Sequence, residues 1–180
     1  QLGQPMTTYR PPAVSPTAAT QLTQAHRALR LGRPEAVWAT LHQLWSHQAS
    51  PGLYTWDAPR PTQDEVADGW QYARGWHNET AVSPDYETAA LLLLLQQDML
   101  AYLDEAAVEP TVVLGAGITP AWLSQPMAVS NLALPGGSIT WQWDGQKMRV
   151  TLRGPMRKIQ LGSAFPPGTE LAVVQKPLRP

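Results

Sequence analysis

DGWQYARGWHNETAVSPDYETAALLLLLQQDML, from Asp68 to Leu100, is followed closely by VVLGAGITPAWL, from Val112 to Leu123, and together these two segments decide the fold. The first joins a loop rich in tryptophan and bearing a histidine to a very apolar helix. The second is a strand that ends in a turn with glycine and proline. This order predicts a change from a helical layer to a β layer at about residue 108.

Two amphipathic helices are expected before these segments. Ser15-Pro16 is typical of an N-cap followed by proline at the first helical position. Apolar residues then recur at the spacing of one helical face, at Ala18, Leu22, Ala25 and Leu29. Gly32 is suited to the left-handed cap that ends this helix, and Pro34 begins the next, which ends at Ser50-Pro51-Gly52. The short connection predicts an antiparallel helical hairpin.

A third helix is expected from Pro84 to about Asp104, because Ser83-Pro84-Asp85 repeats the helix-start signal with an acidic residue near the positive end of the helix dipole. Its side chains are apolar nearly all round from Ala89 to Leu95. A helix of this kind is buried between other layers. We therefore expect it to contact a further helical layer, supplied by a missing N-terminal part of the same protein or by another chain.

Beyond residue 110 the period of the apolar residues changes to two. Apolar and polar residues alternate on both sides of Asp144-Gly145, a pair suited to a type I′ hairpin turn. The apolar positions are Ile139, Trp141, Trp143, Met148, Val150 and Leu152. Further strands are expected at 111–114, 127–134, 156–161 and 169–175. Short strands without intervening helices indicate an antiparallel β-sandwich, so the sequence predicts an α+β fold with a helical region at 1–106 and a sandwich at 110–180.

Composition and charge narrow the classes of function. The 180 residues carry a net charge of −1 with scattered Lys and Arg, so nothing indicates a nucleic-acid partner or an anionic membrane surface. The absence of cysteine excludes disulfides, thiolate metal sites and a cysteine nucleophile, and it does not decide the compartment. The longest apolar run, Ala89 to Leu95, is too short to cross a bilayer.

Neither a metal nor a cofactor is expected. The four histidines lack the spacing of a metal site. Gly115-Ala116-Gly117 is similar to the start of a dinucleotide fingerprint, but the third glycine is missing and Pro120 stands where the helix would continue. We therefore expect a strand-to-turn connection at this point. The sequence contains no phosphate-binding loop of the Walker type and no Gly-x-Ser-x-Gly elbow.

Carboxylates, a histidine and aromatic side chains are crowded together between residues 52 and 79. Sugar rings have apolar C–H faces and polar rims, so a carbohydrate site needs aromatic platforms beside hydrogen-bonding groups. The segment therefore predicts a substrate-binding site, formed by Trp56, Asp57, Trp70, Trp76, His77 and Glu79. The alternative is that these tryptophans fill gaps between the helices and the β layer, with their neighbouring carboxylates in solvent.

The sequence leaves the catalytic residues open. Glycoside hydrolysis needs two carboxylates, which lie roughly 5–10 Å apart on opposite sides of the scissile bond. The candidates are the acidic residues of the same segment, Asp57, Asp64, Glu65, Asp68 and Glu79. They either contain the pair or supply one member, whose partner lies outside this chain. Trp141 and Trp143 share one strand face and are expected in the core rather than in a second ligand platform.

Residues 18–155 resemble the last helical hairpins and the cap of (α/α)6-toroid glycoside hydrolases, including the α-L-rhamnosidase-like group. The resemblance is carried by Gly52-Leu53-Tyr54-Thr55-Trp56, by Gly75-Trp76-His77, by a helix at Glu87–Leu103 and by the strand and turn from Val113 to Leu123. His77 precedes Asn-Glu-Thr, where that group has a run of small residues. The resemblance implies a partial α/α-toroid followed by its β-sandwich cap.

The resemblance also implies a function. The chain is expected to be the carboxyl-terminal portion of a glycoside hydrolase, closing the toroid and lining one side of the sugar cleft, with an oligo- or polysaccharide as its partner. The general acid and base of that family lie on earlier helices, so hydrolysis by this chain alone is not expected. The alternative is a non-catalytic carbohydrate-binding or structural assembly module. An extracellular or periplasmic location is favoured over a cytoplasmic one.

Overall fold

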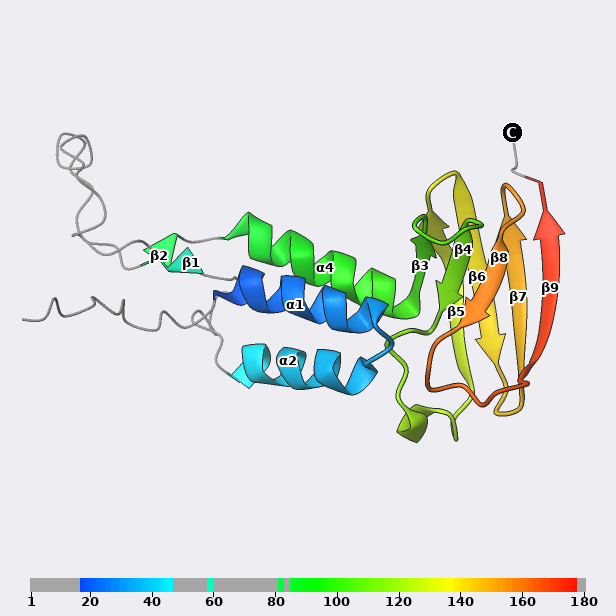
Figure 1. Cartoon of the computed structure of the whole chain (residues 1–180), viewed down its shortest axis with the longest axis horizontal. Helices are drawn as coiled ribbons and strands as arrows, with labels where there is room; N and C mark the ends of the chain where they lie inside the picture. The colour runs from blue at the N-terminus through cyan, green and yellow to red at the C-terminus, as the bar shows by residue number, and fades with distance from the viewer. Residues whose placement is uncertain (1–16, 47–57, 60–80, 83–84, 178–180) are drawn as a thin grey trace, which may run out of the picture.

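The protein has an α+β fold in a computed structural model that describes residues 17–46, 58–59, 81–82 and 85–177. Helices α1, α2 and α4 lie side by side, and one end of this helical layer meets the β layer (Figure 1). The helices and the short 3-10 helix η1 span Ala18–Arg30 (α1), Pro34–Ser46 (α2), Tyr86–Leu100 (α4) and Pro120–Trp122 (η1).

The described strands form a short two-stranded ladder and two larger sheets. The ladder pairs Ala58–Pro59 (β1) with Ala81–Val82 (β2). The larger sheets have the strand orders β3-β4-β8 and β5-β6-β7-β9. Their bounds are Ala101–Asp104 (β3), Thr111–Leu114 (β4), Met127–Leu134 (β5), Gly137–Trp143 (β6), Lys147–Arg153 (β7), Lys158–Leu161 (β8) and Glu170–Lys176 (β9).

Helices α1 and α2 form the antiparallel hairpin that the sequence predicts (Figure 1). Gly32 ends α1 with a positive φ of 68°, and its amide donates to the carbonyl oxygen of Leu29, so the predicted left-handed cap is confirmed. The predicted start at Ser15-Pro16 is wrong, because α1 begins at Ala18 and the Thr17 hydroxyl accepts a hydrogen bond from the amide of Thr20.

Helix α4 is capped by Asp85, whose carboxylate accepts hydrogen bonds from the amides of Glu87 and Thr88. It ends at Leu100 and not near Asp104, as the sequence had predicted. Residues 101–104 form β3 instead, which pairs with β4 in the antiparallel register Ala101↔Leu114. The sequence stays mostly apolar across this boundary, so it does not mark the end of the helix. Residues 101–104 are extended because they pair with β4, and this pairing outweighs their helical propensity.

Both larger sheets are mixed, so the prediction of purely antiparallel strands is wrong at two places. Strand β4 pairs with β8 in parallel, and β7 pairs with β9 in parallel. Parallel neighbours need a crossover connection between them. The connection from β4 to β8 contains the antiparallel strands β5, β6 and β7. The connection from β7 to β9 contains β8. The remaining pairs in these sheets are antiparallel.

The three-stranded sheet has a hydrophobic core on each of its faces. Val112 and Leu114 belong to a core shared with the four-stranded sheet, whereas Val113 belongs to a core shared with the helices. Successive side chains of a strand point to opposite faces, and β3 does the same as β4, with Ala101 in the first core and Tyr102 in the second. Trp141 and Trp143 are buried in the core between the sheets, as their alternation with polar residues predicted.

The hairpin between β6 and β7 differs in detail from its prediction. Trp143 pairs with Met148, and the amide of Asp144 donates to the carbonyl oxygen of Lys147, so Gly145 and Gln146 are the two central residues. Gly145 has a φ of 100°. A positive φ at the first central residue alone belongs to a type II′ turn and not to type I′. The Asp144 carboxylate accepts amide hydrogen bonds from within the turn, and these lower its pKa.

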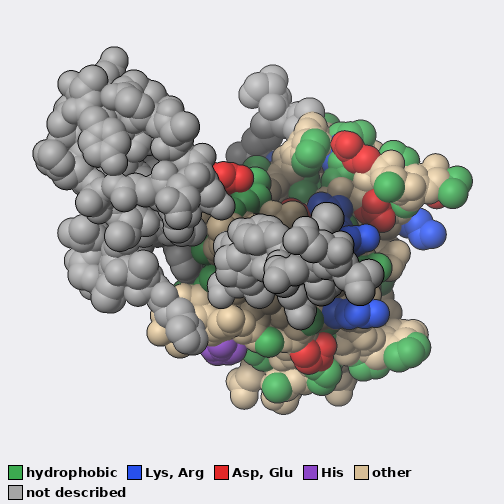
Figure 2. Space-filling model, turned by 60° about the vertical axis from the view of Figure 1, so that its left-hand side comes forward, with side chains coloured by type: hydrophobic (Ala, Val, Ile, Leu, Met, Phe, Trp, Pro, Cys, Tyr) green, Lys and Arg blue, Asp and Glu red, His purple; other side chains and the backbone are tan. Residues whose placement is uncertain are grey.

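The described surface agrees with the charge balance of the sequence. On the face in Figure 2, Lys and Arg side chains lie among Asp, Glu and hydrophobic side chains and do not form one basic patch. Among the described residues, no helix combines the length and apolarity needed to cross a bilayer.

Candidate functional site

The residues predicted to bind substrate lie outside the described parts of the chain. This applies to Trp56, Asp57, Trp70, Trp76, His77 and Glu79, and also to the acidic candidates Asp64, Glu65 and Asp68. The structure describes residues 58–59 and 81–82 near these positions, where Ala58 pairs with Val82 and Pro59 with Ala81 in an antiparallel ladder. The site that the described residues do form lies elsewhere, between α2, α4 and the chain that follows β4.

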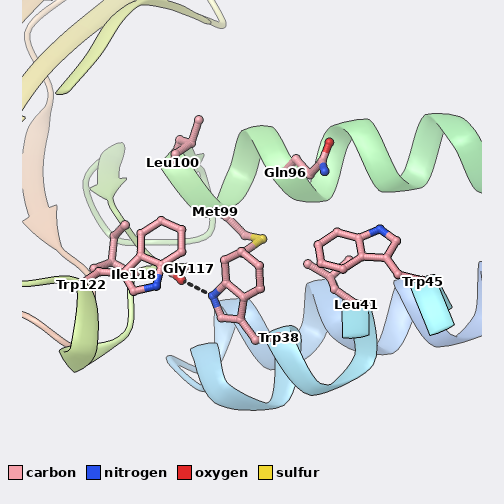
Figure 3. A pocket seen from close by; sticks show the side chains of 9 residues that line it. All are labelled: Trp38, Leu41, Trp45, Gln96, Met99, Leu100, Gly117, Ile118 and Trp122. Carbon is pink, nitrogen blue, oxygen red and sulfur yellow. Dashed lines mark hydrogen bonds between the residues drawn. The ribbon is translucent and has the colours of Figure 1, made fainter. Parts of the chain in front are cut away.

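A cavity of about 200 Å³, named here the tryptophan pocket, lies at the junction of the helical layer and the β layer (Figure 3). Helices α2 and α4 form two of its walls, and the connection from β4 through η1 forms the third. Its lining residues are Trp38, Leu41, Trp45, Gln96, Met99, Leu100, Gly117, Ile118 and Trp122. The lining is mostly apolar, with three indole rings and one side-chain amide.

Gly115 and Gly117 give this third wall its shape. The amide of Gly115 donates to the carbonyl oxygen of Leu100 at 2.9 Å, and the amide of Gly117 donates to that of Met99 at 2.9 Å. These two bonds satisfy carbonyl groups at the end of α4 that have no partner within the helix. A Cβ atom at Gly117 would overlap the Met99 side chain, so only glycine allows this approach. The predicted strand-to-turn connection is confirmed, and it caps α4.

Trp38 fixes α2 to the same connection. Its indole N–H donates to the carbonyl oxygen of Gly117 at 2.8 Å (Figure 3). The Trp38 ring also lies 5.4 Å from the ring of Trp122, centroid to centroid, with an angle of 42° between the planes. His42 stands between Trp38 and Trp45 on the same helix, with its ring edge-on to Trp45 at 5.7 Å. The pocket wall is therefore a connected aromatic cluster with one hydrogen-bonded anchor.

The outer part of the pocket is open to solvent. Trp45 and Trp122 are 42% and 44% exposed, and Gln96 is exposed as well. Neither of these two indole N–H groups nor the Gln96 amide makes a hydrogen bond to any residue that the structure describes. Each is a polar group without a partner among the described residues, and each lies beside an apolar wall. This combination is typical of sites that bind a ligand with both apolar and polar edges.

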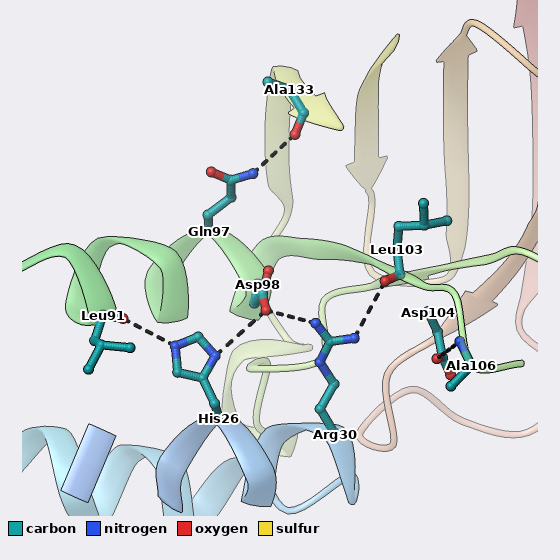
Figure 4. A network of polar contacts seen from close by, with 9 residues as sticks. All are labelled: His26, Arg30, Leu91, Gln97, Asp98, Leu103, Asp104, Ala106 and Ala133. Carbon is teal, nitrogen blue, oxygen red and sulfur yellow. Dashed lines mark hydrogen bonds and ion pairs between the residues drawn. The ribbon is translucent and has the colours of Figure 1, made fainter. Parts of the chain in front are cut away.

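A second cluster of polar side chains joins α1 to α4 and β3 (Figure 4). His26 contacts the carbonyl oxygen of Leu91 through Nε2 at 3.1 Å and the Asp98 carboxylate through Nδ1 at 3.6 Å. Asp98 also accepts a 3.1 Å hydrogen bond from Arg30, whose guanidinium lies 3.8 Å from the ring centre of Tyr102. The Asp98 carboxylate raises the pKa of His26 above 6.5, although burial acts in the opposite direction. These contacts join α1 to α4.

The described residues contain no group of histidine and carboxylate side chains that could hold a metal ion. Comparisons with protein families, with curated proteins and with solved structures find no match to this chain. The arrangement of side chains is therefore the basis for the functional argument.

Two of the three pocket tryptophans follow the helical spacing of apolar residues on α2, which by itself indicates only a buried helix face. Trp38 and Trp45 are seven residues apart on α2, with Leu41 between them on the same face. Trp122 follows Pro120 in the short helix η1, which the pattern marked only as a turn. The available signal was the number of tryptophans, eight in 180 residues, but their meeting point depends on three separate elements.

Proposed function

We propose that this chain is the carboxyl-terminal part of a carbohydrate-processing enzyme of the glycoside hydrolase class. In this role α1, α2 and α4 complete a larger toroidal helical layer, and the strands form a sandwich-like cap that braces it. The chain lines part of the sugar cleft, and the carboxylates that cleave the glycosidic bond are completed by other parts of the enzyme.

The observation that carries this proposal is the presence of two opposite apolar faces on α4. One face faces α1, and its buried Leu95 and Met99 belong to the hydrophobic core that α4 shares with α1. Away from that face, Leu93 and its neighbour Leu94 are 67% and 53% exposed. At 100° per residue, Leu93 lies about 160° around the helix from Leu95. A helix that is apolar on opposite faces is suited to a place between two layers, as in an extended helical array.

This exposed face has the spacing of a helix-packing surface. Tyr86, Ala90 and Leu93 are separated by four and three residues, all three are exposed, and none of them is charged. Residues at this spacing form one stripe along a helix, into which the side chains of a neighbouring helix can pack. The stripe therefore supports a further helix beside α4, as the toroid interpretation requires.

A non-catalytic carbohydrate-binding module is the second candidate. The tryptophan pocket favours it, because its lining among the described residues includes indoles and an amide but no carboxylate. Such a pocket can hold a sugar, whereas hydrolysis needs a carboxylate pair. Binding is therefore common to both candidates, and turnover separates them.

The test is a titration of the full chain with neutral oligosaccharides by calorimetry, together with an assay for newly released reducing ends. We expect binding and no sustained release, because the enzyme interpretation assigns the complete carboxylate pair to more than this chain. Steady hydrolysis by the purified chain would place a complete pair within it. If no oligosaccharide binds, the carbohydrate function is wrong for both candidates.

A further inference from the structure

We propose that the tryptophan pocket is a binding site for one uncharged sugar ring. This inference deepens the proposed function and rests on it. The ring would lie against the exposed indoles of Trp45 and Trp122, and the Gln96 amide would bind its hydroxyl groups. The segment between residues 52 and 79, which the sequence singles out, would then be a separate region of sugar contact or a packing segment.

The size of the pocket limits what it can hold. Pockets for drug-sized ligands measure roughly 300–1,000 Å³, and this one measures about 200 Å³. One pyranose ring matches that space, whereas a chain of several sugars would extend into solvent. The open rim at Trp45 and Trp122 leaves room for such an extension, so a terminal or side-branch ring is the unit that fits.

The walls match the two kinds of surface on a sugar. Indole faces take up the apolar C–H face of a pyranose, in the same way that they pack on other flat apolar groups. Trp38 is held in place by its hydrogen bond to Gly117, so it forms a rigid floor. The indole N–H groups of Trp45 and Trp122, which no described residue accepts, can donate to hydroxyl oxygens, and the Gln96 amide can both donate and accept. A pure hydrocarbon ligand would leave these groups without partners.

The absence of charge along the wall selects a neutral ligand. No lining residue of the pocket, among those described, carries a formal charge. Placing a carboxylate or phosphate against this apolar wall would remove its hydration without providing a cation. An acidic sugar with the same ring should therefore bind less well than its neutral counterpart.

The exposure of the rim tryptophans argues against a purely structural role. Trp141 and Trp143 show what packing tryptophans look like in this protein: both are buried, and their indole N–H groups donate to the carbonyl oxygens of Leu100 and Leu123. Trp45 and Trp122 are instead nearly half exposed, and no described residue accepts their N–H groups. Their environment is that of a surface available to a ligand.

The experiment titrates the full chain with methyl glycosides of glucose, galactose, mannose and xylose, and with methyl glucuronide as the charged match of methyl glucoside. Tryptophan fluorescence and amide chemical shifts report binding. Trp45→Ala and Gln96→Leu should each weaken binding of the best neutral glycoside about five-fold or more. Tyr86→Ala, which removes an exposed aromatic ring outside the pocket, should leave it unchanged. Thermal melting checks that each variant is folded.

The outcomes separate this inference from the proposed function. If oligosaccharides bind and neither pocket variant affects them, the proposed function stands and the pocket assignment is wrong. If no sugar binds, both are wrong. Equal affinity for methyl glucuronide and methyl glucoside would overturn the preference for a neutral ring. Binding of an apolar dye that no glycoside displaces would identify the pocket as a hydrocarbon site and overturn the sugar assignment.

Discussion

The indole N–H of Trp38 donates a 2.8 Å hydrogen bond to the carbonyl oxygen of Gly117, and this bond joins α2 to the connection after β4 across 79 residues of sequence. The amide of the same glycine donates to Met99 at the end of α4. Gly117 therefore links two helices that contact each other little directly, since each packs mainly on α1. The geometry of the tryptophan pocket depends on this link.

Replacing Trp38 with phenylalanine should lower the free energy of unfolding by about 1–2 kcal/mol, because the Gly117 carbonyl oxygen loses its partner while most of the ring is kept. Urea denaturation followed by circular dichroism measures the change. Trp45→Phe is the matched control, since Trp45 is exposed and its N–H has no acceptor among the described residues. Equal losses in the two variants would show that the hydrogen bond contributes nothing specific.

Replacing Gly117 with alanine should destabilise the protein by about 1–3 kcal/mol, because the added Cβ overlaps the Met99 side chain and forces the connection away from α4. Chemical denaturation gives the stability. The same variant should change the fluorescence of Trp38 and Trp122, since both rings rest on this connection. A variant as stable as the parent would mean that α4 and the connection are less closely packed than described.

Replacing Gly145 with valine should cost about 1 kcal/mol or more, since its φ of 100° is unfavourable for a β-branched residue. Nothing surrounds a Cβ atom at this position, so the cost is conformational and not steric. Gly145→Asn is the control, because asparagine tolerates positive φ better. The two variants are compared by thermal melting, and a smaller loss for valine than for asparagine would contradict the turn assignment.

Local signals in the sequence located most of the helices and strands. Gly32 has a short-range role as a cap and was found, whereas the cap of α4 is Asp85 and not Ser83, two residues earlier, where the helix-start signal had placed it. The burial of Trp141 and Trp143 also followed from period-two alternation within one strand. Each of these features depends on residues only a few positions apart, so a sequence pattern is enough to identify it.

Features set by distant partners were missed. The end of α4 at Leu100 depends on the pairing of Ala101 with Leu114, and residues 101–104 are as compatible with a helix as with a strand until that pairing is known. The parallel pairing of β4 with β8 joins Val112 to Ile159, far apart in the chain. The tryptophan pocket likewise needs α2, α4 and η1 together. Contacts between residues far apart in the sequence leave no pattern within a short stretch of it.

The contact between His26 and Asp98 predicts a dependence of stability on pH. Nε2 of His26 faces the Leu91 carbonyl oxygen and Nδ1 faces the Asp98 carboxylate, so both ring nitrogens face acceptors. Only the protonated ring donates from both nitrogens. Because the folded pKa of His26 is raised above 6.5, its contribution is fully present below pH 6.5 and is lost as the pH rises through the folded pKa.

Urea denaturation of the parent and of His26→Gln, measured between pH 5 and 9, tests this dependence. The difference in free energy of unfolding between them should be largest at the acidic end and should shrink as the pH rises. Asp98→Asn should remove most of the pH dependence, because Asp98 is the main cause of the raised pKa. A difference that grows toward alkaline pH would mean that His26 is held in its neutral form.

The leucine run of α4 allows the two faces of the helix to be compared at adjacent positions. Leu95 is fully buried against α1, so Leu95→Ala should cost about 2–5 kcal/mol through lost burial and a residual cavity. Leu94 is its direct neighbour but is more than half exposed, so Leu94→Ala should change the free energy of unfolding by less than about 0.5 kcal/mol. Leu93→Ala should behave like Leu94→Ala for the same reason. Urea denaturation of the three variants measures the contrast. A cost at Leu93 or Leu94 close to that at Leu95 would show that these side chains are already covered within the chain, so that α4 has no exposed apolar surface for a neighbouring helical layer.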